Sequence, residues 1–230
     1  MNPSSPADMG ETLEKTAAAF ALGDEQEVLP ALVHAFLEER LLVPVKPAPH
    51  QSGEPHGSDD SCPPSSLRQA KTPLGPAIVA FTSVDLLTLW DETARPLSVP
   101  GPRLALAALA ETQGLVLLNP PDSGLILGRP ALTALASGDT WLPPWRDVEL
   151  INALVDQGSR WPSIEGVTCV PTLGGGLLIE VEINGNGGAA RDSVEGFASS
   201  LKGMERLFAA AHTVEIRPRW SATLSFGHVG

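Results

Sequence analysis

The spacing of hydrophobic and polar residues divides the first 140 residues into short helices and strands. Apolar residues recur at helical spacing over residues 11–22 and 28–40, which predicts two opening helices. Strands are predicted at 41–45, 75–83, 115–120 and 125–127, and further helices at 84–91, 102–112 and 129–138. Thr82, with Asp85 three residues later, matches the pattern of a helix N-cap box.

Residues 46–73 interrupt this pattern with six prolines, many small polar residues and scarcely an aliphatic side chain. Ordering the backbone of such a stretch would cost on the order of 30–60 kcal/mol. Leu67 is nearly the only side chain whose burial could offset that cost. We therefore expect a disordered insertion over 46–73, where mild proteolysis would cut first.

The remaining residues predict a second unit with the order helix, strand, strand, helix, strand. Helices are expected at 147–157 and 190–211, and strands at 167–172, 177–184 and 213–218. The segment WLPPWRD at 141–147 reads as a rigid joint. The fold class expected is α/β (α+β), with two small mixed-sheet modules at 1–140 and 141–230 and helices packed on each sheet.

Charge narrows the choice of partners. Fifteen Lys and Arg against 27 Asp and Glu leave a net charge of −12, which repels both nucleic acid and anionic membrane surfaces. A basic protein partner would suit it better. No apolar run approaches the roughly 20 residues of a membrane span, and no secretory signal is evident at the start of the chain. The two cysteines form neither a disulfide framework nor a zinc quartet, so a cytoplasmic location is expected.

The stretch GNGGAA at 185–190 offers the strongest match to a cofactor motif. Gly185, Gly187 and Ala190 match G-x-G-x-x-A between a predicted strand and a predicted helix, as in dinucleotide-binding folds. The strand before it alternates apolar residues with Glu180 and Glu182, whereas the strand of a nucleotide fold is apolar on both faces. We therefore predict a strand-to-helix turn and no cofactor.

Other chemistry-bearing residues do not assemble into a recognisable site in the sequence. His34 and Glu38 are two potential ligands on one helix, too few for a metal centre, so none is predicted. The adjacent pairs Glu38–Glu39 and Asp91–Glu92 cannot face each other on a helix and are interpreted as surface charges. No residue is predicted to be catalytic, because neither a nucleophile elbow nor a phosphate-binding loop occurs.

The tryptophans are the remaining candidates for binding. Trp90 lies on a helix among apolar residues and is expected in the core. Trp141 and Trp145 flank the predicted joint, where such rings either hold two modules together or contact a protein partner. These two residues are the candidate partner-binding site.

Residues 81–90 (FTSVDLLTLW), residues 96–121 and the LIL of 125–127 together resemble the SseB N-terminal domain. Asn119 and Pro120 match the Asn-Pro that ends a later strand of that domain. The second module looks like the SseB C-terminal domain, and the Ala, Gly and Pro-rich composition is similar to that of an actinobacterial member. The resemblance implies the fold and a cytoplasmic location. It implies no catalytic residue or cofactor, since the family has none established.

Two functions therefore stand as expectations. The first is a non-catalytic protein-interaction module that presents a mixed-sheet edge, or the groove between its modules, to an unknown and possibly basic protein. The alternative is a metabolite-binding regulator or enzyme linked to amino-acid (serine) metabolism, with a pocket between the modules. A copurifying protein would favour the first, and a copurifying small molecule the second.

Overall fold

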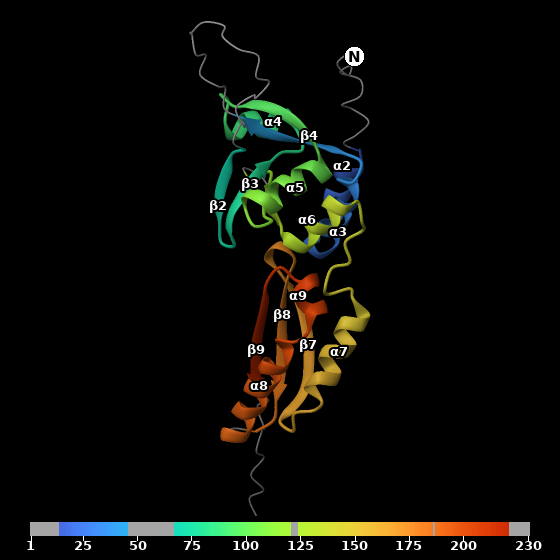
Figure 1. Cartoon of the computed structure of the whole chain (residues 1–230), viewed down its shortest axis with the longest axis vertical. Coiled ribbons are helices and arrows are strands. Elements are labelled where there is room, and N and C mark those ends of the chain that lie inside the picture. The colour runs from blue at the N-terminus through green and yellow to red at the C-terminus, as the bar shows by residue number, and fades with distance from the viewer. Residues whose placement is uncertain (1–13, 46–66, 121–123, 186, 221–230) are drawn as a thin grey trace, which may run out of the picture. The chain divides into compact units, whose positions relative to one another are not determined.

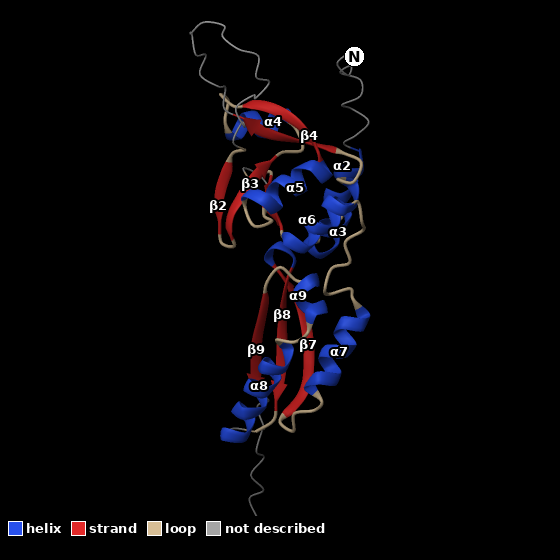
Figure 2. Ribbon diagram, in the orientation of Figure 1, coloured by secondary structure: helices blue, strands red, loops and turns tan. Residues whose placement is uncertain are grey.

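A computed structural model describes residues 14–45, 67–120, 124–185 and 187–220. The chain divides into two compact units, residues 1–141 and 142–230, called here the N-terminal and C-terminal units. Each unit combines helices with its own β-structure (Figure 1; Figure 2).

The N-terminal unit contains a four-stranded mixed sheet and a two-stranded ribbon. The sheet has the order β2 (Gln69–Thr72), β3 (Gly75–Ala80), β5 (Val116–Leu118) and β6 (Leu125–Leu127). Only the pair β3–β5 is parallel. The ribbon pairs β1 (Arg40–Val45) with β4 (Arg95–Pro100), and a bridge between Leu42 and Phe81 connects it to the end of β3.

The described residues of this unit form five helices beside the β-structure: α2 (Glu14–Phe20), α3 (Glu25–Ala35), α4 (Val84–Trp90), α5 (Gly101–Glu111) and α6 (Arg129–Ser137). Local sequence sets their ends. The Asp24 side chain caps α3, and Gly138 ends α6 in the left-handed conformation at φ 76°. β3 is buried along its last four residues, as its continuous apolar run requires.

Two predictions for this unit are corrected. The predicted disordered insertion is wrong at its end, because Gln69–Thr72 forms β2 and pairs with β3; residues 46–66 lie outside the described residues. A turn orders this strand, with the Thr72 hydroxyl donating to the Gly75 carbonyl at 2.8 Å. The N-cap of α4 is Ser83 and not Thr82, since the Ser83 hydroxyl accepts from the Leu86 amide.

The C-terminal unit is a three-stranded sheet with helices on one face. In chain order it contains α7 (Val148–Gly158), β7 (Ile164–Thr172), the short 3₁₀ turn η1 (Leu173–Gly175), β8 (Gly176–Ile183), α8 (Gly188–Leu201), α9 (Glu205–Ala210) and β9 (Val214–Trp220). β8 is central, antiparallel to β7 and parallel to β9. The polypeptide between β8 and β9 is therefore a helical crossover, as a parallel pair requires.

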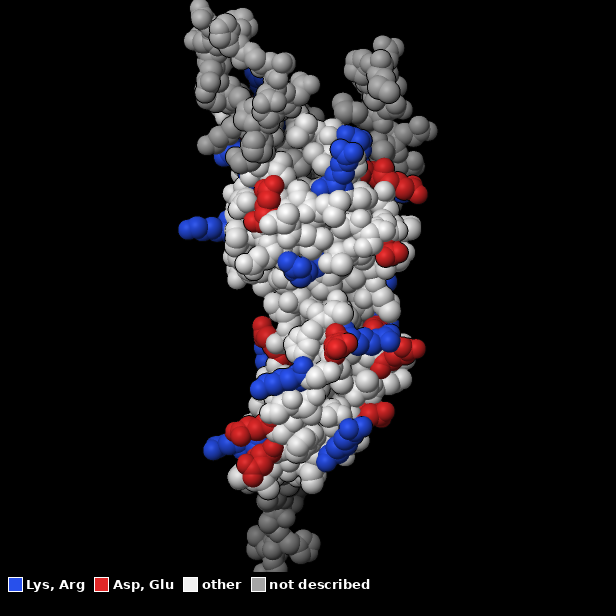
Figure 3. Space-filling model, in the orientation of Figure 1, with Lys and Arg blue, Asp and Glu red and all other residues white. Residues whose placement is uncertain are grey.

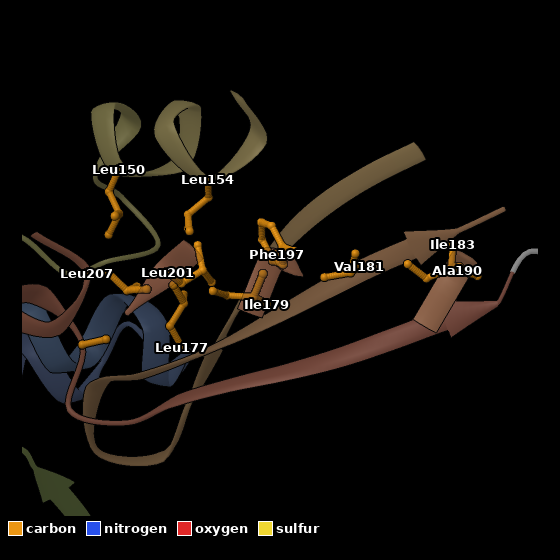
Figure 4. Close-up of a cluster of buried hydrophobic side chains, with 11 residues drawn as sticks. Leu150, Leu154, Leu177, Ile179, Val181, Ile183, Ala190, Phe197, Leu201 and Leu207 are labelled. Atoms are coloured by element: carbon orange, nitrogen blue, oxygen red, sulfur yellow. The ribbon is translucent and has the colours of Figure 1, made fainter. Parts of the chain in front are cut away.

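Alternate residues of β8 build the core of this unit. Its odd-numbered residues from Leu177 to Ile183 are buried against the helices, whereas Glu180 and Glu182 lie on the opposite face. Figure 4 shows Leu150 and Leu154 of α7 pointing toward the side chains of this cluster. The helices thus cover one face of the sheet and leave the charged face uncovered by them.

The predicted helix at 190–211 is corrected to two helices, α8 and α9, separated by residues 202–204. Met204 has φ −90° and ψ 83°, which no α-helix accommodates. The break re-aims α9 so that Leu207 is buried in the core. The rest of the predicted order is confirmed, as is the α+β class with mixed sheets. Among the described residues, no helix has the length and apolar content of a membrane span.

Candidate interaction surface

Glu39 is a buried carboxylate of the N-terminal unit that holds the start of α2. Its Oε1 accepts from the backbone amides of Lys15 at 3.1 Å and Thr16 at 3.3 Å, and its Oε2 accepts from the Thr16 hydroxyl. Glu39 is 3 % exposed, so its interpretation as a surface charge is wrong. Its neighbour Glu38 is exposed as expected, and Lys15, through a hydrogen bond and its charge, lowers the pKa of Glu38.

Thr82 and Asn119 lie together at the carboxyl ends of the parallel strands β3 and β5. The Thr82 amide donates to Asn119 Oδ1 at 3.0 Å, and Asn119 Nδ2 donates to the Thr82 hydroxyl at 3.0 Å. Asn119 is buried and has φ 50°, a left-handed conformation that asparagine tolerates better than most residues. The amide group of Asn119 is therefore engaged in joining the two strand ends.

Trp90 lies in a second structural cluster. It packs against Phe81 with ring centroids 5.6 Å apart, and the Arg68 guanidinium lies 4.7 Å from the Trp90 ring. Arg68 also pairs with Asp91, whose pKa is lowered chiefly by its hydrogen bonds with Thr93. The expected core position of Trp90 is thus confirmed as partly buried packing. Asp91 is half-buried and paired with Arg68, and its neighbour Glu92 is exposed as expected.

In the C-terminal unit, Asp147 and Arg206 form an ion-paired cluster at the start of α7. Asp147 is the N-cap of α7 and accepts from the Leu150 amide at 3.1 Å. Arg206 of α9 donates to both Asp147 oxygens, at 2.7 and 2.8 Å, and to Glu149 at 2.5 Å. The hydrogen bonds with Arg206 lower the pKa of Asp147. This clamp fixes the first turn of α7 to the start of α9.

The glycine motif and the cysteine have the surroundings of structural residues. Gly185 and Gly187 adopt φ 86° and 119° between β8 and α8, which matches the predicted strand-to-helix turn. Residue 186 lies outside the described residues. Cys169 packs against the core of the C-terminal unit, and burial raises the pKa of its thiol. A protonated thiol is a poor nucleophile.

The two candidate partner-binding tryptophans are not prominent on the surface. Trp141 is 7 % exposed, and Trp145 is partly buried against the core of the C-terminal unit. Partner contact through Trp141 and Trp145 stays a prediction.

The outer edge of β9 carries backbone groups that do not take part in the pairing with β8. The Leu177 amide donates to the Thr213 carbonyl at 2.8 Å, which fixes the alternation along β9. Residues 215, 217 and 219 therefore direct their backbone groups toward β8, and residues 214, 216, 218 and 220 direct theirs outward. Within the described residues no strand pairs with that outer edge. Pro218 occupies an outward position, where its missing N–H costs no bond to β8.

The side chains of β9 give its two faces different characters. Val214 and Ile216 pack against the core, whereas Glu215, Arg217 and Arg219 lie on the face without helices. Arg217 and Arg219 both approach Glu180 Oε1, at 3.7 and 3.3 Å, so one carboxylate serves two guanidinium groups. The view in Figure 3 likewise shows acidic and basic side chains interspersed on the C-terminal unit.

Sequence analysis predicted that a sheet edge could bind a partner but did not identify the outer edge of β9. The signal in the sequence is the alternation of Glu215-Ile216-Arg217, followed by Pro218. The opposite edge strand, β7, has a register irregularity between Ile164 and Gly166, which makes it a poorer template for pairing. The outer edge of β9 is therefore the candidate interaction surface.

The fold and this surface define a two-unit α+β protein in which the edge strand β9 pairs on one side only within the described residues. The model of the family described as SseB protein N-terminal domain matches residues 13–134, more than half of the chain. The protein therefore belongs to the SseB family. No curated protein and no solved structure matches the chain. The resemblance of residues 141–230 to the SseB C-terminal domain, and the actinobacterial origin, stay predictions.

Proposed function

We propose that the protein is a non-catalytic interaction module that acts in the cytoplasm and receives a strand of a protein partner on the outer edge of β9. The observation that carries this proposal is the row of outward backbone groups from Val214 to Trp220. Strand addition at such an edge supplies main-chain hydrogen bonds, and alternate side chains supply selectivity. The free thiol of Cys169 supports a reducing compartment.

The use of the buried ionisable groups supports the non-catalytic part of the proposal. Glu39 holds the start of α2, and Asp147 holds the start of α7. Each carboxylate is directed at a backbone amide and a second donor of its own unit. An acid or base that fixes a helix end in this way is committed to folding.

The partner is expected to carry an extended segment with alternating side chains. One set would contact Ile216 and Trp220 on the helix side of β9, and the other would lie beside Arg217 and Arg219. The net charge of −12 favours the approach of a basic protein over longer distances. Long-range charge and short-range pairing thus select different features of the partner.

The proposal is tested by affinity purification of the full chain from its native cells, comparing Ile216→Pro with Ile216→Ala. Both variants shorten the same side chain, but only the proline removes the outward N–H. A stoichiometric protein retained by the wild type and by Ile216→Ala, and lost with Ile216→Pro, is the expected result. Equal retention by both variants would contradict the proposal. A small molecule released on denaturation, without a protein partner, would favour the metabolite-binding alternative.

A further inference from the structure

The outer edge of β9 is complementary to itself. We propose that one partner for this edge is a second copy of the chain, paired antiparallel through β9 about Ile216. This inference rests on the proposed strand addition and names the occupant of the edge. It follows from the charges of β9 and from the direction of its backbone groups.

Pairing about Ile216 places opposite charges together. In an antiparallel pair centred on Ile216, Glu215 of each copy lies directly opposite Arg217 of the other copy, which gives two ion pairs related by the two-fold axis. Glu215 has no ion pair within the described residues, and Arg217 shares Glu180 with Arg219 at the longer distance of 3.7 Å. Both side chains of each new ion pair therefore have capacity for it.

The backbone groups select the same register. Ile216 directs its N–H and C=O outward, so the two copies of Ile216 exchange two hydrogen bonds across the axis. Val214 of each copy then lies opposite Pro218 of the other and donates to the Pro218 carbonyl. Pro218 cannot return this bond because it has no N–H. The strand pair thus contains four backbone hydrogen bonds instead of six.

Antiparallel β9 pairs centred on a neighbouring residue have less favourable charge contacts or fewer backbone hydrogen bonds than the pair centred on Ile216. Centring the pair on Arg217 places the two copies of Arg217 opposite each other, and centring it on Glu215 does the same with two carboxylates. A pair centred on Pro218 lacks both central donors and brings Arg217 opposite Arg219. Ile216 is the centre that combines two complementary ion pairs with a complete central pair of hydrogen bonds.

The two-fold axis and the net charge limit the strength of this dimer. The axis lies perpendicular to the sheet, so the helices of both copies cover one face of a continuous six-stranded sheet. A strand pair buries less than a standard interface, and two chains of charge −12 repel each other. At physiological ionic strength charges beyond about 8 Å are screened, which leaves the ion pairs at the axis dominant. A reversible dimer with Kd on the order of 10–100 µM follows.

Charge exchange tests the proposal in the full chain by sedimentation velocity over a range of concentrations. Arg217→Glu places like charges opposite each other twice, as does Glu215→Arg, and each is expected to raise the dimer Kd at least about tenfold. The double variant E215R/R217E restores complementarity and is expected to recover dimerisation. Pro218→Val supplies the missing donors and should lower Kd about tenfold. Arg103→Glu, an exposed charge reversal on α5, is the matched control and should leave Kd unchanged.

Circular dichroism checks that each variant is folded. If Arg217→Glu does not fold, Glu215→Arg provides the same test, because it leaves the ion pairs of Glu180 with Arg217 and Arg219 in place. A wild type that remains monomeric at about 1 mM would overturn the proposal. Single variants that dimerise like the wild type, or a double variant that fails to recover, would do the same. Because affinity purification with the Ile216 variants reports on any protein partner, a failed self-association does not by itself contradict strand addition.

Discussion

The adjacent residues Glu38 and Glu39 provide a matched pair for testing how the N-terminal unit is held together. Replacing Glu39 by alanine removes the acceptor for the amides of Lys15 and Thr16 at the start of α2. Losing such a cap costs about 0.5–2 kcal/mol. It also leaves the Thr16 hydroxyl, in a residue 3 % exposed, without its acceptor, at about 1–3 kcal/mol. The total expected loss of stability is about 1.5–5 kcal/mol.

The exchange rate of the Phe81 amide measures this loss within the N-terminal unit, because that amide is hydrogen-bonded to the Leu42 carbonyl and fully buried. If its exchange requires opening of the unit, Glu39→Ala should accelerate it roughly 10- to 4000-fold, at a factor of ten for each 1.4 kcal/mol. Glu38→Ala removes an exposed carboxylate and should leave the rate close to that of the wild type. Equal exchange rates in the two variants would refute the assigned role of Glu39.

Two further predictions concern the C-terminal clamp and a close backbone contact. Because the folded pKa of Asp147 lies below its ordinary value, its stabilising contribution is present above about pH 3.8 and is lost as pH falls through the folded pKa. When the free energy of unfolding is measured in urea as a function of pH, Asp147→Asn should therefore reduce the loss of stability at acid pH. A Cβ on Gly101 would lie 2.0 Å from the Phe36 carbonyl oxygen, so Gly101→Ala should lower the Tm strongly. Gly203→Ala, with open space around its Cβ, should not.

Most helices and strands could be predicted because their apolar spacing agrees with their burial. The failures occurred where a distant contact decided the structure. Gln69–Thr72 has no strand pattern of its own and is ordered by pairing with β3. The carboxylate of Glu39 resembles that of Glu38 in the sequence, and only the packing of α2 over it distinguishes the two. The break between α8 and α9, at residues 202–204, accompanies the burial of Leu207 in the core.

A sheet edge could be predicted as the candidate surface, but the strand that forms this edge could not. Alternation in the sequence indicates a strand at β9, but an edge is defined by strand order, which places β8 in the centre. The direction of each backbone group then follows from the register with Leu177. Self-complementarity about Ile216 is visible in the sequence only after these two facts are known.

Residue-resolved amide exchange along β9, measured by NMR in the full chain as its concentration is raised, tests strand addition most directly. The account predicts that the amides of Glu215 and Arg217, which face β8, are protected at every concentration. The Ile216 amide should exchange rapidly in dilute protein and become protected as the edge is occupied. An Ile216 amide already protected in the dilute monomer, or one that stays unprotected when a partner is bound, would contradict the account.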